Sequence, residues 1–200
     1  MSRLITNAIR STSASADAIT MDGSGNVTFP ANATCSGTAT GFGGGKLVNY
    51  GSVIKTDSFS ASVAQGAFSS NCIELSYTAA STSNKLLIMA NLTIGYQHSQ
   101  SVRMRFDIGG SNVDSVTGDA SGNRTRTTTE AFLSSQNQMS NMSFNFIHSS
   151  PATSSTTYGC QIGAKDNSTQ TVYLNRSHGD LNYDYGSRCA SSLIILEFEA

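Results

Sequence analysis

Apolar and polar residues alternate along most of the chain from Leu47 onward. The clearest runs are residues 102–108, 142–146, 158–162 and 172–174, with a shorter and less regular run at residues 72–77. A period of two predicts strands that have one face in a core and one face in water. Clusters of Gly, Asn, Asp and Ser separate the runs, and no stretch has helical periodicity. We therefore predict an all-β protein whose C-terminal part is an antiparallel sandwich or jelly roll of about eight to ten short strands.

Two segments, residues 85–94 and 193–198, break this alternation because they are apolar on both faces. A strand with this pattern is covered on both sides. In an antiparallel sandwich one face packs on the core and the other normally faces water. We therefore expect a neighbouring subunit to cover the second face. Cover by a loop of the same chain is the alternative.

The segment 18–30 is predicted to form two short strands around a turn. Ile19 and Met21 alternate with polar residues before the turn, and Val27 and Phe29 do so after it. An isolated hairpin is marginally stable in water. The sequence offers no helix or third strand nearby, so we expect this unit to pack on copies of itself. Pairing within one chain and pairing between chains are both open.

These patterns divide the chain into four parts. Residues 1–16 form an N-terminal docking arm, residues 17–40 a strand-turn-strand collar, residues 41–46 a glycine hinge, and residues 47–200 the head domain. The run GFGGGK in the hinge departs from a phosphate-binding loop at both its first glycine and its final hydroxyl position, so it is interpreted as a linker. The strong apolar residues of the arm, which are candidate docking contacts, are Leu4, Ile5 and Ile9.

Composition and charge restrict the classes of partner. The chain is 38% hydrophobic and 12% charged with a formal net charge of -1, which argues against nucleic-acid binding through a basic face. Arg103, Arg105, Arg124 and Arg126 are the one local concentration of arginine, interpreted as solvent-facing strand residues. The sequence has no signal-peptide core and no span long enough to cross a bilayer, so we expect synthesis in the cytoplasm and no membrane insertion. The residues interpreted as small buried hydrophobes are Cys35, Cys72, Cys160 and Cys189.

The sequence provides little material for catalysis. His98, His148 and His178 are far apart, no metal-ligand spacing occurs, and the 13 acidic residues include no pair suited to glycoside hydrolysis. We therefore expect no enzymatic activity, no metal and no cofactor.

One stretch favours binding instead. Residues 175–188 combine aromatic, imidazole and guanidinium groups that suit recognition of sugars or proteins. The candidate receptor contacts are Arg176, His178, Tyr183, Tyr185 and Arg188. The alternative is an ordinary surface loop with one or two tyrosines packed into the sandwich.

Several segments in order resemble a domain at the C-terminus of fibre-type virion proteins of marine tailed phages. They are GGGKLVNYGSVIKTDSFS, STSNKLLIMANLTIGY, GDASGNRTRTTTEAF, SPATSSTTYGCQIGAKDNSTQTVYLNRS and ASSLIILEFEA. The lead ITNAIRSTSASADAITMDGSGNVTFPANATCSG is similar to short repeats that precede such domains in phage tail fibres. The resemblance implies a homotrimeric virion appendage with a jelly-roll head, comparable in outline to trimeric tumour-necrosis-factor-like heads. Because the chain has about one such repeat, it favours a short tail fibre, a knob or a capsid-mounted head fibre over a long fibre.

The resemblance and the patterns together lead to one expected function. The chain is expected to be a structural fibre or knob protein of a phage virion, projecting from tail or capsid and mediating host attachment or capsid decoration. Expected partners are two further copies of the chain, other virion proteins, and a host surface glycan or protein. The expected trimer contacts are Ile19, Met21, Val27, Phe29, Leu193 and Ile195. The alternatives are a tail-spike enzyme that trims polysaccharide and a free lectin-like binding module.

Overall fold

The computed structural model describes residues 8–9, 19–24, 26–29, 46–97, 99–166, 168–183 and 186–199. The chain divides into two compact units, Met1–Gly43 and Gly44–Ala200. Several residues singled out in the sequence lie outside the described residues, namely Leu4, Ile5, Cys35, His98 and Tyr185, together with the hinge up to residue 45. Among the described residues, no helix has the length and apolar character needed to cross a bilayer.

The N-terminal unit contains a small antiparallel sheet. β2 (Ile19–Met21) and β3 (Val27–Thr28) pair within the chain, with Met21 opposite Val27. The turn between them is held by the Asp22 carboxylate, which accepts hydrogen bonds from the backbone N–H groups of Ser24 at 2.9 Å and Asn26 at 2.8 Å. The predicted strand-turn-strand unit is therefore present, and its two strands pair within one chain.

A third strand completes this small sheet. β1 (Ala8–Ile9) pairs with β2, so that Ile9 lies opposite Ile19 and the strand order is β1-β2-β3. The expectation that no third strand lies nearby is wrong. Two residues are enough to pair with a short strand, and a segment this short carries too little alternation to be recognised in the sequence.

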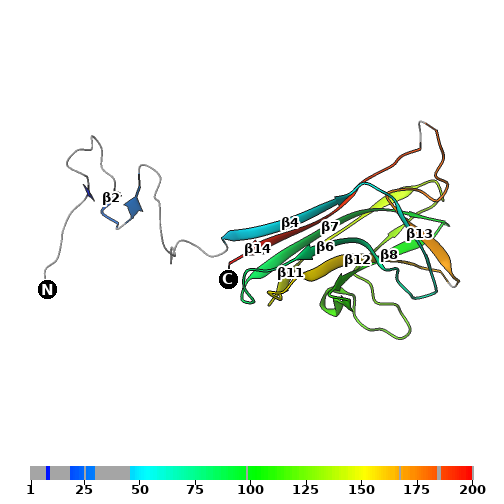
Figure 1. Cartoon of the computed structure of the whole chain (residues 1–200), viewed down its shortest axis with the longest axis horizontal. Coiled ribbons are helices and arrows are strands. Elements are labelled where there is room, and N and C mark those ends of the chain that lie inside the picture. Colours follow the sequence, from blue (N-terminus) through cyan, green and yellow to red (C-terminus); the bar gives the residue numbers. More distant parts are fainter. Residues whose placement is uncertain are drawn as a thin grey trace. The chain divides into compact units, whose positions relative to one another are not determined.

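The second unit is built from two antiparallel sheets (Figure 1). The first contains β4 (Leu47–Lys55), β5 (Phe59–Val63), β7 (Lys85–Tyr96), β11 (Met139–Ser149), β13 (Gln170–Leu174) and β14 (Ser191–Phe198). The second contains β6 (Asn71–Tyr77), β8 (Ser101–Ile108), β9 (Ser111–Asn112), β10 (Thr129–Phe132) and β12 (Thr156–Ala164). A 3-10 turn, η1 (Asp114–Val116), precedes β10.

The register shows that two pairs of strands in the first sheet are each one interrupted strand. β11 pairs with one edge of β7, from Lys85 to Gly95. β14 pairs with residues 85–91 of β7, and β13 pairs with residues 94–96. Because β11 occupies the first edge, β14 and β13 must share the other one. Both run antiparallel to β7 and therefore in the same direction. β4 pairs with β14 and β5 pairs with β13, so β4 and β5 form a second interrupted strand.

This arrangement gives each sheet four strand positions. The order is β4/β5, β14/β13, β7, β11 in one sheet and β6, β12, β8, β10 in the other, and the chain crosses repeatedly between the sheets. Eight positions connected in this order form a jelly roll. The predicted all-β jelly-roll sandwich is confirmed.

The core lies between the two sheets. Phe106 of β8 packs against Phe144 and Phe146 of β11, with ring centroids 6.3 and 4.7 Å apart. Leu193 and Ile195 of β14 are fully buried in the same core. Their assignment as trimer contacts is therefore wrong, because alternation along β14 turns these two residues inward.

The cysteines behave as packing residues where they are described. Cys72 and Cys160 are buried free thiols in adjacent strands, as expected, and burial raises the pKa of Cys72 to about 12. Cys189 is free and half-buried.

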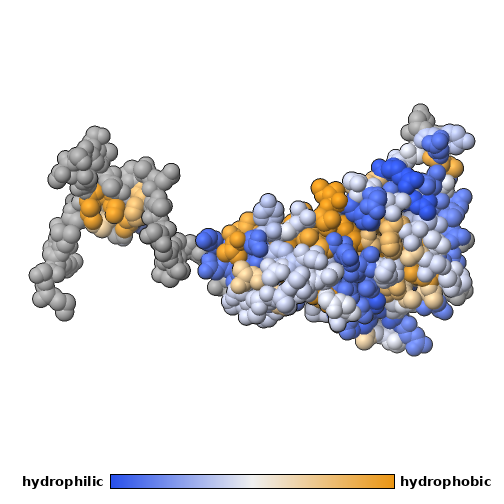
Figure 2. Space-filling view, in the orientation of Figure 1, coloured by the Kyte–Doolittle hydropathy of each residue, from blue (hydrophilic) through white to orange (hydrophobic). Residues whose placement is uncertain are grey.

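The outer face of the first sheet carries an apolar row that crosses four strands. Leu196 of β14 lies between Tyr50 of β4 and Leu87 of β7, and Leu87 lies beside Ile147 of β11. Tyr50 is 69% exposed and Ile147 is 53% exposed, while Leu87 and Leu196 are half-buried. Figure 2 shows hydrophobic surface along β4, where Leu47 and Ile54 are also exposed. We call Tyr50, Leu87, Ile147 and Leu196 the outer apolar row.

Candidate functional site

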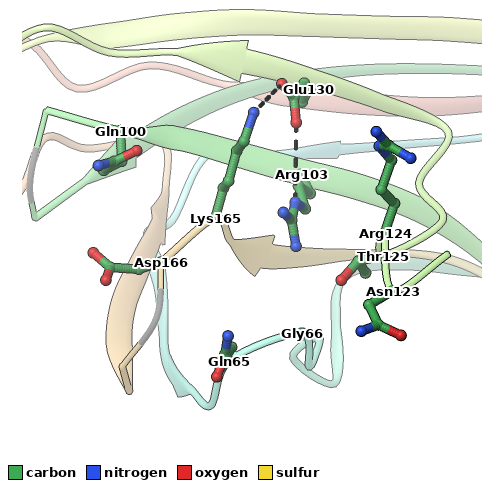
Figure 3. Close-up of a pocket in the computed structure, with 10 residues that line it drawn as sticks. All are labelled: Gln65, Gly66, Gln100, Arg103, Asn123, Arg124, Thr125, Glu130, Lys165 and Asp166. Atoms are coloured by element: carbon green, nitrogen blue, oxygen red, sulfur yellow. Dashed lines mark hydrogen bonds and ion pairs between the residues drawn. The ribbon is translucent and has the colours of Figure 1, made fainter.

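A pocket of about 660 Å³ lies at one end of the second sheet. Its walls come from the turn after β5, the start of β8, the loop between η1 and β10, and the end of β12 (Figure 3). The lining residues are therefore drawn from segments that are far apart in the sequence, from Gln65 to Asp166. Arg103 of β8 lies opposite Glu130 of β10 in the register, so sheet pairing alone places these two side chains beside each other. This volume is within the range of small-molecule binding sites.

Charged groups face one another in this pocket. The Glu130 carboxylate lies 3.1 Å from the Lys165 ammonium and 3.9 Å from the Arg103 guanidinium, as the dashed lines in Figure 3 show. Asp166 also lines the pocket and accepts a hydrogen bond from the Tyr96 hydroxyl at 3.4 Å. The pocket thus holds two carboxylates that no sequence pattern had paired, and Glu130 is held between two cations.

The interpretation of the four arginines as solvent-facing strand residues is wrong. Arg103 and Arg105 do lie on the outer face of β8, but loops cover them, and Arg105 stacks over the Phe68 ring at 4.2 Å. Burial lowers the pKa of Arg105, and its Nε donates to Gln161 at 2.8 Å. Arg124 and Arg126 lie in the loop before β10 and not in a strand. The interpretation failed because alternation shows which face a residue occupies but not what covers that face.

The second candidate region is the loop at residues 175–190, which interrupts the composite strand β13/β14. Asn175 anchors its start, with a buried side chain and a positive φ of 63°. The Asn175 amide donates to the backbone carbonyls of Lys55 at 2.8 Å and Asp57 at 2.9 Å, where β4 gives way to β5. The Asn175 side-chain oxygen accepts from the Ser191 hydroxyl at 2.6 Å. One buried amide therefore joins both strand interruptions and fixes where the loop leaves the sheet.

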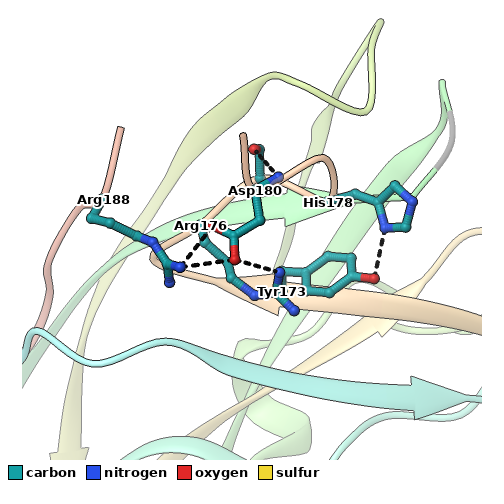
Figure 4. Close-up of polar contacts among 6 residues, drawn as sticks. Tyr173, Arg176, His178, Asp180 and Arg188 are labelled. Atoms are coloured by element: carbon teal, nitrogen blue, oxygen red, sulfur yellow. Dashed lines mark hydrogen bonds and ion pairs between the residues drawn. The ribbon is translucent and has the colours of Figure 1, made fainter. Parts of the chain in front are cut away.

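Asp180 organises the middle of this loop (Figure 4). Its carboxylate lies 3.2 Å from the Arg176 guanidinium and 2.7 Å from the Arg188 guanidinium. Arg176 also stacks over the Tyr173 ring at 4.4 Å, and the Tyr173 hydroxyl lies 2.7 Å from Nδ1 of His178. The candidate residues Arg176, His178 and Arg188 are thus brought together through two residues, Asp180 and Tyr173, that the sequence did not single out.

The aromatic candidates of this loop are placed differently. Tyr183 is 61% exposed, and Tyr185 lies outside the described residues. Tyr173, on β13, is buried on the face opposite to Val172 and Leu174, where its ring packs against Arg176 and His178 of the loop. A second pocket of about 600 Å³ lies beneath the loop, lined by uncharged groups that include Thr93, Asn141, Leu181 and Cys189.

Sequence reasoning found the loop but missed the charged pocket. The loop is one continuous stretch, whereas the pocket joins residues that are up to about 100 positions apart. The outward alternation of Arg103 and Arg105 was the one available signal. In the described part of the chain, no group of three His, Cys, Asp or Glu side chains could hold a metal ion.

No protein-family model and no curated protein matches this sequence. Among solved structures, the chain is similar to a chain in the structure of infectious bursal disease virus, Gx strain, with 16% sequence identity and a TM-score of 0.38. The similarity covers 76% of this chain and 38% of the viral chain. A partial overlap of this size does not establish a family, and the resemblance to phage fibre proteins stays an expectation from the sequence.

Proposed function

We propose that this protein is a non-enzymatic structural protein of a virion surface. In this proposal it is a homotrimeric fibre or knob that projects from tail or capsid, and its jelly-roll head mediates host attachment or particle decoration. The N-terminal unit connects the head to other virion proteins, and the 175–190 loop contacts the host surface.

The outer apolar row is the observation that carries the proposal. The outer face of an antiparallel sheet normally faces water and is polar. Here four apolar side chains from four neighbouring strands lie side by side, and two of them are more than half exposed. A contiguous apolar surface of this kind marks a protein interface. A second copy of the chain is the partner that we propose for it.

The N-terminal unit supports the same association. Ile9, Val27 and Phe29 are exposed apolar residues, and none of residues 9, 19–24 and 26–29 is buried. A sheet with strands of two or three residues is not stable alone in water. Contacts between copies would cover these side chains. The number three comes from the resemblance to phage fibre proteins.

The 175–190 loop supports an adhesive role for the head. Asp180 and Tyr173 hold the two arginines in place, which limits the conformational entropy lost when the loop binds a partner. Three copies of a weak site on one rigid head would gain affinity through effective concentration.

The proposal is tested on full-length protein and on intact particles. Sedimentation equilibrium at micromolar concentration is expected to give three times the chain mass of 21.0 kDa. Antibodies against the head are expected to label purified particles, and free protein is expected to slow particle adsorption to host cells. A monomer, or particles that lack the protein, would contradict the proposal. Release of reducing ends from host polysaccharide would instead establish the alternative of a trimming enzyme.

A further inference from the structure

The charged pocket at the end of the second sheet has no role in the proposed function. None of its lining residues belongs to the 175–190 loop or to the outer apolar row. A ligand in this pocket would therefore not contact that loop or that row.

Positive charge is in excess in this pocket. The lining contains three cationic side chains and two carboxylates, which leaves one uncompensated positive charge. The cations are Arg103, Arg124 and Lys165, and the carboxylates are Glu130 and Asp166. Arg103 and Lys165 share Glu130. The excess charge is therefore centred on Arg124, and a pocket with this balance favours an anion.

Arg124 is placed to bind an anion through two of its oxygens. Its Nη1 donates to the backbone carbonyl of Ser121 at 3.4 Å and to the Ser121 hydroxyl at 2.8 Å, which holds the guanidinium in position. Among the described residues no carboxylate pairs with Arg124, and Figure 3 shows its side chain without a dashed line. The Nε and Nη2 groups stay available as a two-donor edge, and such an edge matches the two oxygens of a carboxylate or sulfate.

The rest of the lining suits a ligand rich in hydroxyl groups. Gln65, Gln100 and Asn123 contribute amides, Thr125 contributes a hydroxyl, and no aromatic side chain lines the pocket in the part of the chain that the structure describes. Amides donate to and accept from hydroxyl groups. A volume of about 660 Å³ is large enough for one or a few sugar units.

We propose that this pocket binds an acidic sugar residue, with the two-donor edge of Arg124 on its carboxylate or sulfate and the amides on its hydroxyl groups. Carboxylated and sulfated sugars share this chemistry, and both occur as units of surface polysaccharides. The proposal goes beyond the proposed function by adding a second binding site, and it rests on that function for its biological setting alone.

The test is calorimetric titration of the full-length protein with three soluble trisaccharides. They are trigalacturonic acid, a sulfated galactose trisaccharide and the unsubstituted galactose trisaccharide. We expect saturable binding of one or both acidic sugars and at least tenfold weaker binding of the neutral one. Stronger binding of the first or of the second acidic sugar identifies carboxylate or sulfate as the recognised group.

Three variants locate the binding. Arg124→Gln is expected to weaken binding of the acidic sugar by about tenfold to hundredfold, because it removes a charge-assisted pair of hydrogen bonds. Arg124→Lys keeps the charge but loses the two-donor edge, so its affinity for the acidic sugar is expected to lie between those of the original chain and Arg124→Gln. Lys85→Gln removes the same charge from an exposed position outside the pocket and is expected to bind like the original chain.

Several results would overturn the proposal. They are no saturable binding of any acidic sugar, equal binding of the neutral sugar, or unchanged binding by Arg124→Gln. Oligomeric mass and particle labelling do not depend on these titrations. Failure of the sugar site would therefore leave the proposed virion function to its own test.

Discussion

At the scale of single residues, buried polar side chains hold the ends of this sandwich. Asn175 satisfies backbone carbonyls at the break between β4 and β5. Glu197, at the C-terminal end of β14, is completely buried and accepts hydrogen bonds from the Tyr77 hydroxyl at 2.8 Å, the Ala80 N–H at 2.8 Å and the Asn84 amide at 2.7 Å. A buried carboxylate is tolerated where donors of this number replace water.

The environment of Glu197 predicts a dependence of stability on pH. Burial acts to raise the pKa of Glu197, but the hydrogen bonds from Asn84, Tyr77 and two backbone amides outweigh it and lower the pKa below its ordinary 4.5. A carboxyl with a lowered pKa in the folded state stabilises the fold above its ordinary pKa. This stabilisation is lost as the pH falls through the lowered value.

We expect Glu197→Gln to lower the free energy of unfolding at pH 7 by about 2–4 kcal/mol, because its NH₂ group would face donors and one acceptor would be lost. The difference from the original chain should shrink below pH 4.5. Urea unfolding at pH 7 and at pH 3.5 measures both values. Glu199→Gln, at an exposed position, is the control and should change little. An equal difference at both pH values would contradict the assigned role of the Glu197 charge.

At the scale of elements, the two faces of β14 lie in different environments. Leu193 and Ile195 point into the core, whereas Ile194 and Leu196 lie on the outer face between β4 and β7. The prediction from sequence that this strand is apolar on both faces is correct. Leu193 and Ile195, which were expected to be trimer contacts, lie on the inner face, because a shift of one position in a strand exchanges the two faces.

Acidic substitutions should separate these two faces. Ile195→Asp is expected to prevent folding, because it places an unpaired charge in the core. Leu196→Asp is expected to leave a folded head but abolish association, because the charge would lie in the outer apolar row. Circular dichroism and sedimentation distinguish these outcomes. Ser192→Asp is the control, because it adds the same charge to the same face of β14 outside the outer apolar row, and this variant should remain associated. If the Leu196→Asp protein sediments with the same oligomeric mass as the original chain, the outer apolar row is not the interface.

At the scale of the whole molecule, the two units differ in how they are stabilised. The head has a continuous core between its sheets, whereas none of residues 9, 19–24 and 26–29 in the N-terminal unit is buried. A unit with its own core is able to fold alone. The small sheet of β1, β2 and β3 is expected to depend on contacts between copies.

This difference predicts the behaviour of a fragment that begins at Gly44. The fragment should unfold cooperatively with a midpoint close to that of the head in the full chain. Its association should be at least tenfold weaker, because the exposed side chains of Ile9, Val27 and Phe29 no longer contribute. Sedimentation over a range of concentrations gives both dissociation constants. Equal constants would mean that the N-terminal unit takes no part in association.

Much of the fold was predictable because alternation is a local property. The run at residues 102–108 became β8 with Val102, Met104 and Phe106 inside, and the two double-faced segments became β7 and β14, which pair with each other. The glycine pair at residues 109–110 turns between β8 and β9 with positive φ at both positions. The 175–188 stretch was found for the same reason, since its residues are contiguous.

The sequence by itself determined the all-β class, the position of most strands and the inward or outward side of most residues in them. The tertiary structure alone decided the joining of β13 with β14 and of β4 with β5, the burial of Asn175 and Glu197, and the pocket around Arg124. The physical reason is the sequence distance over which each property acts. Side-chain alternation depends on neighbours two positions apart, whereas the register, the burial of a charge and the placement of Gln65 and Lys165 in one pocket depend on which distant strands pair.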